Sequence, residues 1–377
     1  MFDDAIRLSL DRGDRNLAFQ YAERRRAQPA FGSITAHPPA IADLQQRLRG
    51  TAAAVLHITS LPDEVVVFAV TENDVAVARS PITRAHLVEL AAAAENGKAA
   101  PLANLFEILI RASIRLFARS EEVIVIPDRR LERVPFAALY DASRKMHLIQ
   151  YLSVAIAPSA AVLDIVETSA PREVTAITLP SGESVATHAL PEASGEVSEI
   201  VTLYARARVI SPADATYASL RDALRHDAVI HIAGHTERQT GSDDTTLRFT
   251  GGDRATWSRI AADPVGRNSV VVLAACDTLR GSTSPHVRSL SLGAAFAAAG
   301  AGSVIGTLTP IGDADARELF LSIHRYLAAG ESPARALRRT QLDAIASGRL
   351  PAWQSIALLT RCIQTSRTKG RTSWATS

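Results

Sequence analysis

The sequence predicts an α/β protein in which a mainly parallel sheet lies between two layers of helices. Short apolar runs alternate with segments of helical spacing through the second half of the chain. Two of the runs, 228–233 and 270–275, are rich in β-branched residues, which is typical of buried parallel strands. The first run leads to His235 and the second to Cys276, so both strands are expected to deliver a reactive side chain.

The composition is that of an ordinary globular protein with room for two domains. The chain has 377 residues, 47% of them hydrophobic and 21% charged, and its net charge of +2 is too small to indicate a nucleic-acid partner. Its two cysteines, Cys276 and Cys362, cannot form a disulfide framework, and no Cys/His spacing indicates a metal site. We therefore expect no metal and no cofactor.

The chain is expected to work in the cytoplasm. The segment Met1-Phe2-Asp3-Asp4 carries acids where a signal peptide carries bases, and no apolar run reaches the length of a membrane span. Free cysteines fit a reducing compartment. No membrane partner is expected.

The first half of the chain alternates helical and strand patterns. A helix pair over 4–29 turns at 12–14, and a further helix follows at 41–48. The remaining pattern predicts three strands at 53–59, 65–71 and 75–79, helices at 84–96 and 102–119, strands at 123–126 and 152–156, and a helix at 160–167.

The second half predicts the parallel sheet. Its expected strands are 174–179, 207–210, 228–233, 270–275, 303–308 and 355–360, and its expected helices are 192–204, 216–225, 255–262, 291–299, 313–328 and 333–346. The Gly- and Pro-containing loop 180–191 is typical of a connection beside a site. The tail from residue 364 is expected to be disordered.

His235 and Cys276 are the candidate base and nucleophile. The helix at 255–262 makes the second strand parallel to the first, so both carboxyl ends face one crevice. A histidine titrates near neutral pH and can generate the thiolate that attacks a carbonyl and forms an acyl-enzyme. The backbone N–H groups of Thr236 and Cys276 are the expected oxyanion donors, each worth about 3 to 4 kcal/mol of barrier.

A purely structural interpretation competes with this one. Cysteine is among the residues most often buried, and a histidine at a strand end is often a hydrogen-bonded core residue. His231 and Cys362 are interpreted in that way, as packing residues.

The residues around the pair resemble the CHAT domain peptidases of the caspase and separase clan. The family patterns H-x-A-G-H-G and L-S-A-C-E-T-x-x-G are matched here by His231-Ile232-Ala233-Gly234-His235-Thr236 and Leu273-Ala274-Ala275-Cys276-Asp277-Thr278-Leu279-Arg280-Gly281. Further segments similar to family signatures are Ile126-Pro127-Asp128, Val134-Pro135-Phe136-Ala137-Ala138-Leu139, Ala157-Pro158-Ser159-Ala160 and 291–304. The blocks recur in the family's order over about residues 50–360. The 41 positions between His235 and Cys276 are comparable to the spacing of about 50 in caspases.

The resemblance implies a caspase-like three-layer α/β/α fold in tandem. Residues 1–49 are then an N-terminal helical segment that resembles the last unit of a tetratricopeptide array, either docked on the next domain or ending a longer architecture. Residues 50–169 are a caspase-like domain without catalytic residues, 170–363 the catalytic domain, and 364–377 the tail. The implied function is a cysteine endopeptidase of bacterial signalling or defence, latent until a helical-repeat sensor or another partner activates it on a protein substrate.

Two departures from the family pattern leave alternatives open. Thr236 replaces the glycine that usually follows the catalytic histidine, so its side chain is expected to crowd the approach. The family's L-W-P-V-D-D is Leu308-Thr309-Pro310-Ile311-Gly312-Asp313 here, without the aromatic residue. A decayed module that binds protein through the same cleft is the alternative. A thioesterase or amidase is less favoured, since no Gly-x-Ser-x-Gly segment is present.

Substrate preference does not follow from the sequence. Asp277 and Asp313 are candidate substrate-binding residues, and Asp277 is equally well a turn acid. An acidic preference requires an arginine-lined pocket and a basic one an acidic pocket. Candidates for both are present, namely Arg238, Arg248 and Arg280 against Asp243, Asp244, Asp277 and Asp313.

Overall fold

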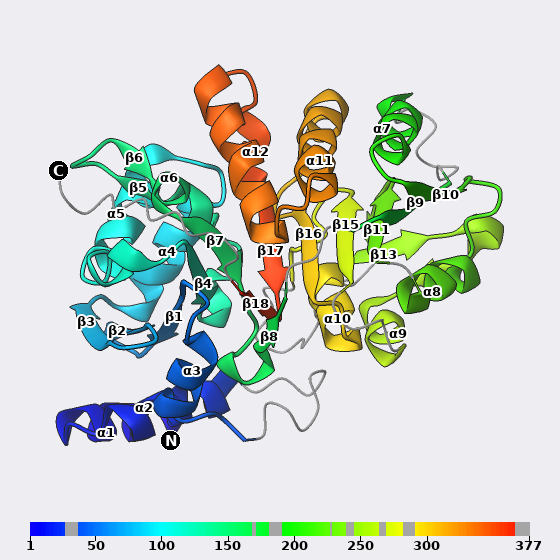
Figure 1. Cartoon of the computed structure of the whole chain (residues 1–377). Coiled ribbons are helices and arrows are strands. Elements are labelled where there is room, and N and C mark those ends of the chain that lie inside the picture. Colours follow the sequence, from blue (N-terminus) through cyan, green and yellow to red (C-terminus); the bar gives the residue numbers. More distant parts are fainter. Residues whose placement is uncertain are drawn as a thin grey trace. The chain divides into compact units, whose positions relative to one another are not determined.

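The computed structural model describes residues 1–26, 37–167, 171–180, 191–226, 228–238, 245–263, 269–281 and 291–365. The chain divides into two compact units, Met1–Glu167 with Arg361–Ser377, and Thr168–Thr360 (Figure 1). We call them unit 1 and unit 2 and describe each by itself. Among the described helices, none combines the length and the apolar character that crossing a membrane requires.

Unit 1 has a five-stranded stretch of sheet in the order β7-β4-β1-β2-β3. Its strands are β1 (Ala53–Ser60), β2 (Glu64–Val70), β3 (Val75–Pro81), β4 (Glu122–Ile126) and β7 (Ser153–Ile156). β1 to β3, the three strands expected within 53–79, form an antiparallel meander, whereas β1, β4 and β7 are parallel. Every residue of β1 is buried, as expected for a strand covered on both faces.

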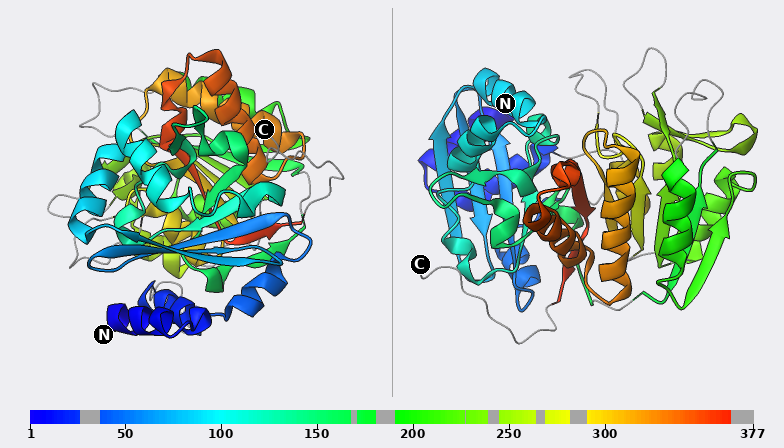
Figure 2. Two further views of the ribbon diagram at one scale, coloured as in Figure 1. Left: turned by 90° about the vertical axis from the view of Figure 1, so that its left-hand side faces the viewer. Right: turned by 90° about the horizontal axis from the view of Figure 1, so that it is seen from above.

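Helices cover both faces of this sheet. They are α1 (Phe2–Asp11), α2 (Arg15–Arg26) and α3 (Ile41–Leu48), followed by α4 (Arg84–Ala94), α5 (Ala99–Leu109) and the short α6 (Leu148–Tyr151). Figure 2 shows α1 to α3 on the side of the strands opposite to α4 and α5. Two short ladders, β5 (Tyr140–Asp141) with β6 (Met146–His147) and β8 (Asp164–Val166) with β18 (Cys362–Gln364), complete the unit.

Buried charges attach α2 to the rest of unit 1. The Glu23 carboxylate accepts hydrogen bonds from Ser159 Oγ at 2.7 Å and from the Ala160 N–H at 3.0 Å, and it lies 3.0 Å from His57 Nε2. Burial alone raises the pKa of Glu23, but His57 and these hydrogen bonds bring it below its ordinary value. Arg26 donates from Nε to the Pro158 carbonyl at 3.0 Å. The N-terminal helices are therefore docked within unit 1.

Unit 2 contains the predicted parallel sheet, in the order β10-β9-β11-β15-β16-β17. The strands are β9 (Glu173–Thr178), β10 (Arg206–Ile210), β11 (Val229–Ala233), β15 (Val270–Ala274), β16 (Ser303–Thr307) and β17 (Ile356–Thr360). Only β17 runs antiparallel to its neighbour within this set. The mixed α/β fold with a mainly parallel sheet is thus confirmed.

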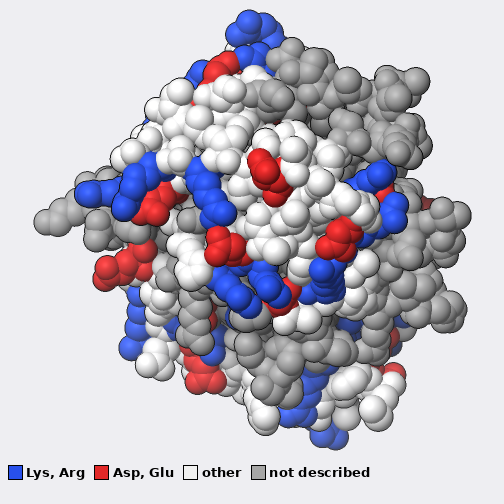
Figure 3. All heavy atoms as spheres, turned by 90° about the vertical axis from the view of Figure 1, so that its right-hand side faces the viewer, with Lys and Arg blue, Asp and Glu red and all other residues white. Residues whose placement is uncertain are grey.

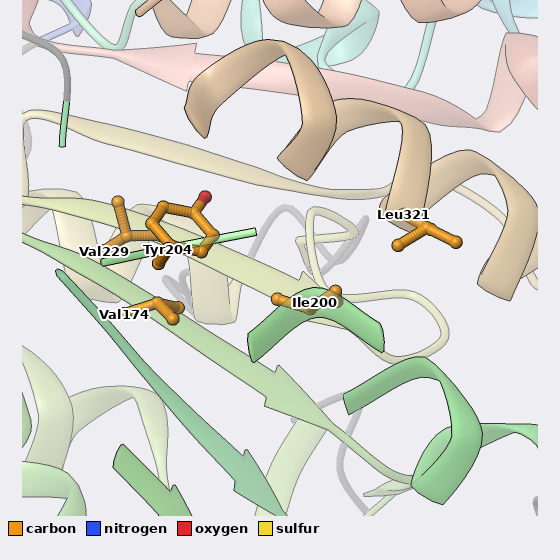
Figure 4. Packing of buried hydrophobic residues seen from close by; sticks show 5 residues of the cluster. All are labelled: Val174, Ile200, Tyr204, Val229 and Leu321. Atoms are coloured by element: carbon orange, nitrogen blue, oxygen red, sulfur yellow. The ribbon is translucent and has the colours of Figure 1, made fainter. Parts of the chain in front are cut away.

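Two helical layers enclose the sheet of unit 2. α7 (Pro191–Val201), α11 (Asp313–Ala328) and α12 (Pro333–Ser347) lie on one face, and α8 (Tyr217–His226), α9 (Trp257–Ala262) and α10 (Leu292–Ala299) on the other (Figures 1 and 2). Figure 4 shows part of the first interface, where Val174 and Val229 of the strands meet Ile200, Tyr204 and Leu321 from the helical side. This packing anchors β11, the strand that leads to His235.

The outer edge strand β10 carries charged side chains that form ion pairs. Arg206 and Arg208 form ion pairs with Glu173 and Asp222 respectively. Figure 3 views this side, where basic and acidic side chains interleave. Charged edge strands resist pairing with a further strand.

Two predicted helices of the first half are wrong in extent. The segment expected as a helix at 160–167 forms a 3-10 turn, Ala160–Val162, and then β8, because β8 pairs with β18 from the far end of the chain. The helix expected at 102–119 ends at Leu109. Beyond it Arg111 forms an ion pair with the buried Asp141, Nη2 to Oδ1 at 2.6 Å, and the chain re-forms only a 3-10 turn at Leu116–Arg119. Both differences arise from tertiary partners that a local pattern does not reveal.

Candidate active site

His235 and Cys276 occupy matching places beyond the ends of two neighbouring parallel strands. The register of β11 and β15 sets Ala233 opposite Ala274, and each candidate residue follows its register partner by two positions. Both residues are half-buried. The two side chains thus belong to the same carboxyl edge of the sheet, the edge at which open α/β sheets bind ligands.

The segment before His235 is packed tightly against the end of β9. Gly234 has a φ of 151°, and a Cβ atom placed on it would lie 2.7 Å from Leu179 Cβ. Leu179 donates its N–H to the Ala233 carbonyl at 2.8 Å, and Gly234 donates to the Ala274 carbonyl at 3.3 Å. A side chain at position 234 would be strained and would clash, so only glycine allows this approach.

The chain turns sharply directly after Cys276. Asp277 has a φ of 57°, in the left-handed region that few residues other than glycine adopt, although aspartate tolerates it. Arg280 donates its N–H to the Asp277 carbonyl at 3.1 Å and closes the turn. The chain therefore leaves the direction of β15, which ends at Ala274, directly after Cys276.

The backbone on both sides of Cys276 is held by threonine hydroxyls that follow β11 and end β16. Thr236 Oγ1 donates to the Cys276 carbonyl at 2.8 Å from the β11 side. Thr307 Oγ1, at the end of β16, donates to the Ala275 carbonyl at 2.7 Å. Two consecutive carbonyl groups are therefore fixed by hydroxyl donors, which limits the movement of the cysteine between them.

The following turn is attached to β16 as well. The buried Thr278 accepts a hydrogen bond at Oγ1 from the Thr307 N–H at 2.9 Å, and Leu279 donates its N–H to the Thr307 carbonyl at 2.9 Å. A Cβ atom on Gly306 would lie 2.5 Å from Thr278 Oγ1, so the glycine is needed for this contact. Thr307 thus acts as the point on β16 to which the turn is bound.

The surroundings of Cys276 favour the neutral thiol. Burial raises its pKa, and the negative charge of Asp277 raises it further, while a backbone hydrogen bond with Ile311 lowers it. Ile311 lies in the loop between β16 and α11, so a third strand end takes part in the site. Cys362 differs, because it is buried in β18 and burial raises its pKa to about 12. The interpretation of Cys362 as a buried residue is confirmed.

The remaining predicted site residues lie around the same edge. The hydroxyl of Thr236 is bonded to the Cys276 backbone, so the prediction that this side chain crowds the approach omitted its main contact. Asp277 has a side chain that is 14% exposed, 3.8 Å from Arg280 Nη1. Asp313 begins α11, two residues after Ile311, and is half-buried. Asp243, Asp244 and the side chain of Arg238 lie outside the described residues.

A buried polar network beneath the site did not follow from the sequence. His231 Nδ1 lies 3.1 Å from His324 Nε2, and His324 Nδ1 lies 2.8 Å from the Tyr204 hydroxyl. Glu196 Oε1 of α7 is 3.2 Å from His231 Nε2. Burial, and next the charge of His231, keep the pKa of His324 well below its usual value. His231 is fully buried, as predicted, but these polar contacts bind α7 and α11 to β11.

The candidate pair thus lies beyond two neighbouring strand ends of a helix-covered, mainly parallel sheet. The model of the CHAT domain family matches residues 99–366, which is more than half of the chain, and the chain belongs to that family. A search of curated proteins found no match.

The solved structures that resemble the chain in fold include a separase, a gingipain and an initiator caspase. The separase of Saccharomyces cerevisiae, in its complex with securin, aligns with a TM-score of 0.63 at 9% identity over 95% of this chain. The alignment covers 34% of that separase chain, so this chain spans about a third of its length. The Arg-specific gingipain R of Porphyromonas gingivalis aligns with a TM-score of 0.44 at 10% identity over 73% of this chain and 74% of its own. The Drosophila initiator caspase Dronc aligns with a TM-score of 0.29 at 10% identity, over 52% of this chain and 87% of its own.

Proposed function

We propose that the protein is a cysteine endopeptidase with His235 as base and Cys276 as nucleophile. The observation that carries the proposal is the matched position of the two residues beyond β11 and β15, joined by the hydrogen bond from Thr236 to the Cys276 carbonyl. Membership of the CHAT domain family and the caspase-like fold support the same class of chemistry.

In the proposed reaction the His235 imidazole accepts the thiol proton, and the Cys276 sulfur attacks the carbonyl carbon of the scissile peptide bond. The carbon–nitrogen bond breaks as the imidazolium returns the proton to the leaving amine, and water then hydrolyses the thioester. The N–H groups of Thr236 and Cys276 are the proposed oxyanion donors, and Asp277 and Asp313 the proposed substrate contacts at the rim.

We further propose that the resting enzyme is latent. Burial raises the pKa of Cys276, so the thiolate is scarce until the site is rearranged. A protein partner is the proposed trigger, either a helical-repeat sensor or another regulator. Yeast separase, which shares the fold, was crystallised with its partner securin. The proposed setting is signalling or defence in a bacterial cytoplasm.

The proposed organisation is a tandem. Residues 50–169 are a caspase-like domain without a catalytic pair, since neither cysteine of the sequence lies in them. Residues 170–363 are the catalytic domain, residues 1–49 a helical segment and 364–377 a tail. Gln364 belongs to β18, so the prediction of disorder from residue 364 is wrong at its first residue. Residues 366–377 lie outside the described residues, so disorder of the rest of the tail remains a prediction.

Digestion of a proteome-derived peptide library tests the activity. Wild-type protein, Cys276→Ala and His235→Ala are compared, and new termini are read by mass spectrometry. Cuts made by wild type and absent from both variants are expected. Cuts that persist in Cys276→Ala would exclude this nucleophile.

A decayed, protein-binding module is the second candidate. The raised pKa of Cys276 and the presence of Thr236 in place of glycine favour it. In that case no library peptide is cut, no electrophilic peptide labels Cys276, and a partner binds wild type and Cys276→Ala equally well.

A further inference from the structure

A pocket in unit 2 adjoins the segment that carries His235. It has a volume of about 330 Å³ and lies beyond the carboxyl ends of β9 and β10, with a wall supplied by the 3-10 turn Thr250–Gly252. Four residues of its lining are apolar, namely Pro180, Pro212, Ala213 and Phe249. Arg248 is the one charged side chain among the described residues that line it.

The pocket is built from fixed backbone. Phe249 is buried, and its ring packs edge-to-face on Tyr217 at 6.0 Å between centroids. The Phe249 N–H donates to the Asp253 carbonyl at 2.8 Å, and the Thr250 N–H donates to the Ala215 carbonyl at 2.9 Å. These contacts hold Arg248, the residue before Phe249, at a defined place on the wall.

Arg248 keeps hydrogen-bond capacity for a ligand. Its Nη1 donates to Glu237 Oε1 at 3.2 Å, while Glu237 also accepts from Arg254 Nε at 3.0 Å. One carboxylate is thus shared by two guanidinium groups, and the three side chains together carry one net positive charge. The Arg248 side chain is 26% exposed, so its remaining N–H donors can reach an incoming group.

The position of the pocket relates it to the candidate active site. Pro180 follows Leu179, the residue packed on Gly234, and Glu237 lies two positions after His235. β9 is two strand positions from β15, which corresponds to about 10 Å along the sheet edge. An extended peptide advances about 3.3 Å per residue, so a substrate side chain roughly two to five positions from the cut bond can enter the pocket.

Resting on the proposed peptidase function, we propose that this pocket is a substrate subsite that accepts an acidic side chain, with Arg248 as its specificity-determining residue. The planar guanidinium pairs with a carboxylate through two parallel hydrogen bonds, whereas an incoming lysine or arginine meets a like charge. The apolar lining residues can contact the methylene groups of aspartate or glutamate.

A positional-scanning peptide library tests the subsite. In each sublibrary one position is fixed as Asp, Glu, Asn, Gln or Arg, and cleavage is measured with wild type, Arg248→Gln, Arg248→Lys and Arg208→Gln. Arg208 belongs to the same unit and pairs with Asp222, but it does not line the pocket or contact Glu237, so Arg208→Gln is the matched control. Thermal unfolding checks that the variants remain folded.

We expect wild type to prefer an acid over its amide by about tenfold at one position, a difference of the size that a charge-assisted pair supplies. Arg208→Gln should keep that preference, Arg248→Lys should keep part of it, and Arg248→Gln should lose it. Cleavage by wild type without any acid preference, or a preference that persists in Arg248→Gln, overturns the proposal.

A second arm separates failure of the subsite from failure of the peptidase function. If no peptide is cut, the same sublibraries are immobilised and bound to the Cys276→Ala protein, with and without Arg248→Gln. Retention that depends on an acidic residue and on Arg248 supports the pocket even when the proteolytic function fails. Retention without that dependence overturns the pocket.

Discussion

The hydroxyl of Thr236 is expected to position Cys276, the proposed nucleophile, although the family pattern has glycine at this place. Its Oγ1 donates to the Cys276 carbonyl at 2.8 Å, across the gap between the two strand ends. Thr236→Val replaces the hydroxyl with a methyl group of similar size, so it removes this hydrogen bond and leaves the Cys276 carbonyl without that donor.

The expected magnitude follows from one hydrogen bond. A neutral intramolecular hydrogen bond contributes about 0.5 to 1.5 kcal/mol net, and about 1.4 kcal/mol corresponds to a tenfold change. If the bond holds the cysteine in its reactive geometry, Thr236→Val should lower kcat by roughly twofold to tenfold and leave KM nearly unchanged. Thr236→Ser keeps the donor and should restore most of kcat.

Steady-state cleavage of a library-derived peptide measures this effect, and Thr246→Val is the matched control. Thr246 is buried in β13 (Thr245–Arg248) and donates from Oγ1 to the Glu237 carbonyl at 3.3 Å, without contacting Cys276. Thr246→Val should therefore lower the stability of the protein but leave kcat unchanged. Equal kcat in Thr236→Val and wild type, or equal losses in both valine variants, would refute the positioning role.

Three further predictions concern the surroundings of the site. Thr307→Val leaves the Ala275 carbonyl without its hydroxyl donor in a buried place, so denaturant unfolding should show a loss of about 1 to 3 kcal/mol, and no loss would contradict the contact. Asp277→Asn removes a charge that raises the pKa of Cys276, so the pH profile of iodoacetamide alkylation should move to lower pH; an unmoved profile would contradict this. His324 is buried with a pKa well below its usual value, so below about pH 6.5 the unfolded state binds a proton that the folded state does not. Stability should therefore fall with decreasing pH, by at most about 1.4 kcal/mol per unit, and less steeply in His324→Phe; equal slopes would contradict the assignment.

The sheet of unit 2 could be predicted because its strands carry their own signals. β11 and β15 are apolar, β-branched and followed by polar residues, and the positions of His235 and Cys276 follow from those strand ends. The three-stranded sheet of β12 (Thr236–Arg238), β13 and β14 (Arg254–Ala255) could not be predicted, since its strands are short and rich in threonine, arginine and glutamate. Short polar strands resemble loops until their partners are known.

The contacts that hold the site required the structure. Thr307 lies at the end of a predicted strand, but nothing in the sequence indicates that its hydroxyl meets the Ala275 carbonyl. Ile311 takes part through its backbone, which carries no residue-specific signal at all. The network of His231, His324 and Tyr204 joins residues far apart in the chain. A single sequence indicates the residues that can react, whereas the groups that orient them depend on distances in the fold.

The rate at which iodoacetamide alkylates Cys276, followed by mass spectrometry in wild type and His235→Ala between pH 5 and 10, tests the proposed pair most directly. Cys362 serves as an internal control, because burial raises its pKa to about 12 and it should stay unlabelled. If His235 generates the thiolate, wild type should react faster than His235→Ala at neutral pH, and the two pH profiles should differ in shape. Superimposable profiles for the two proteins would contradict the dyad.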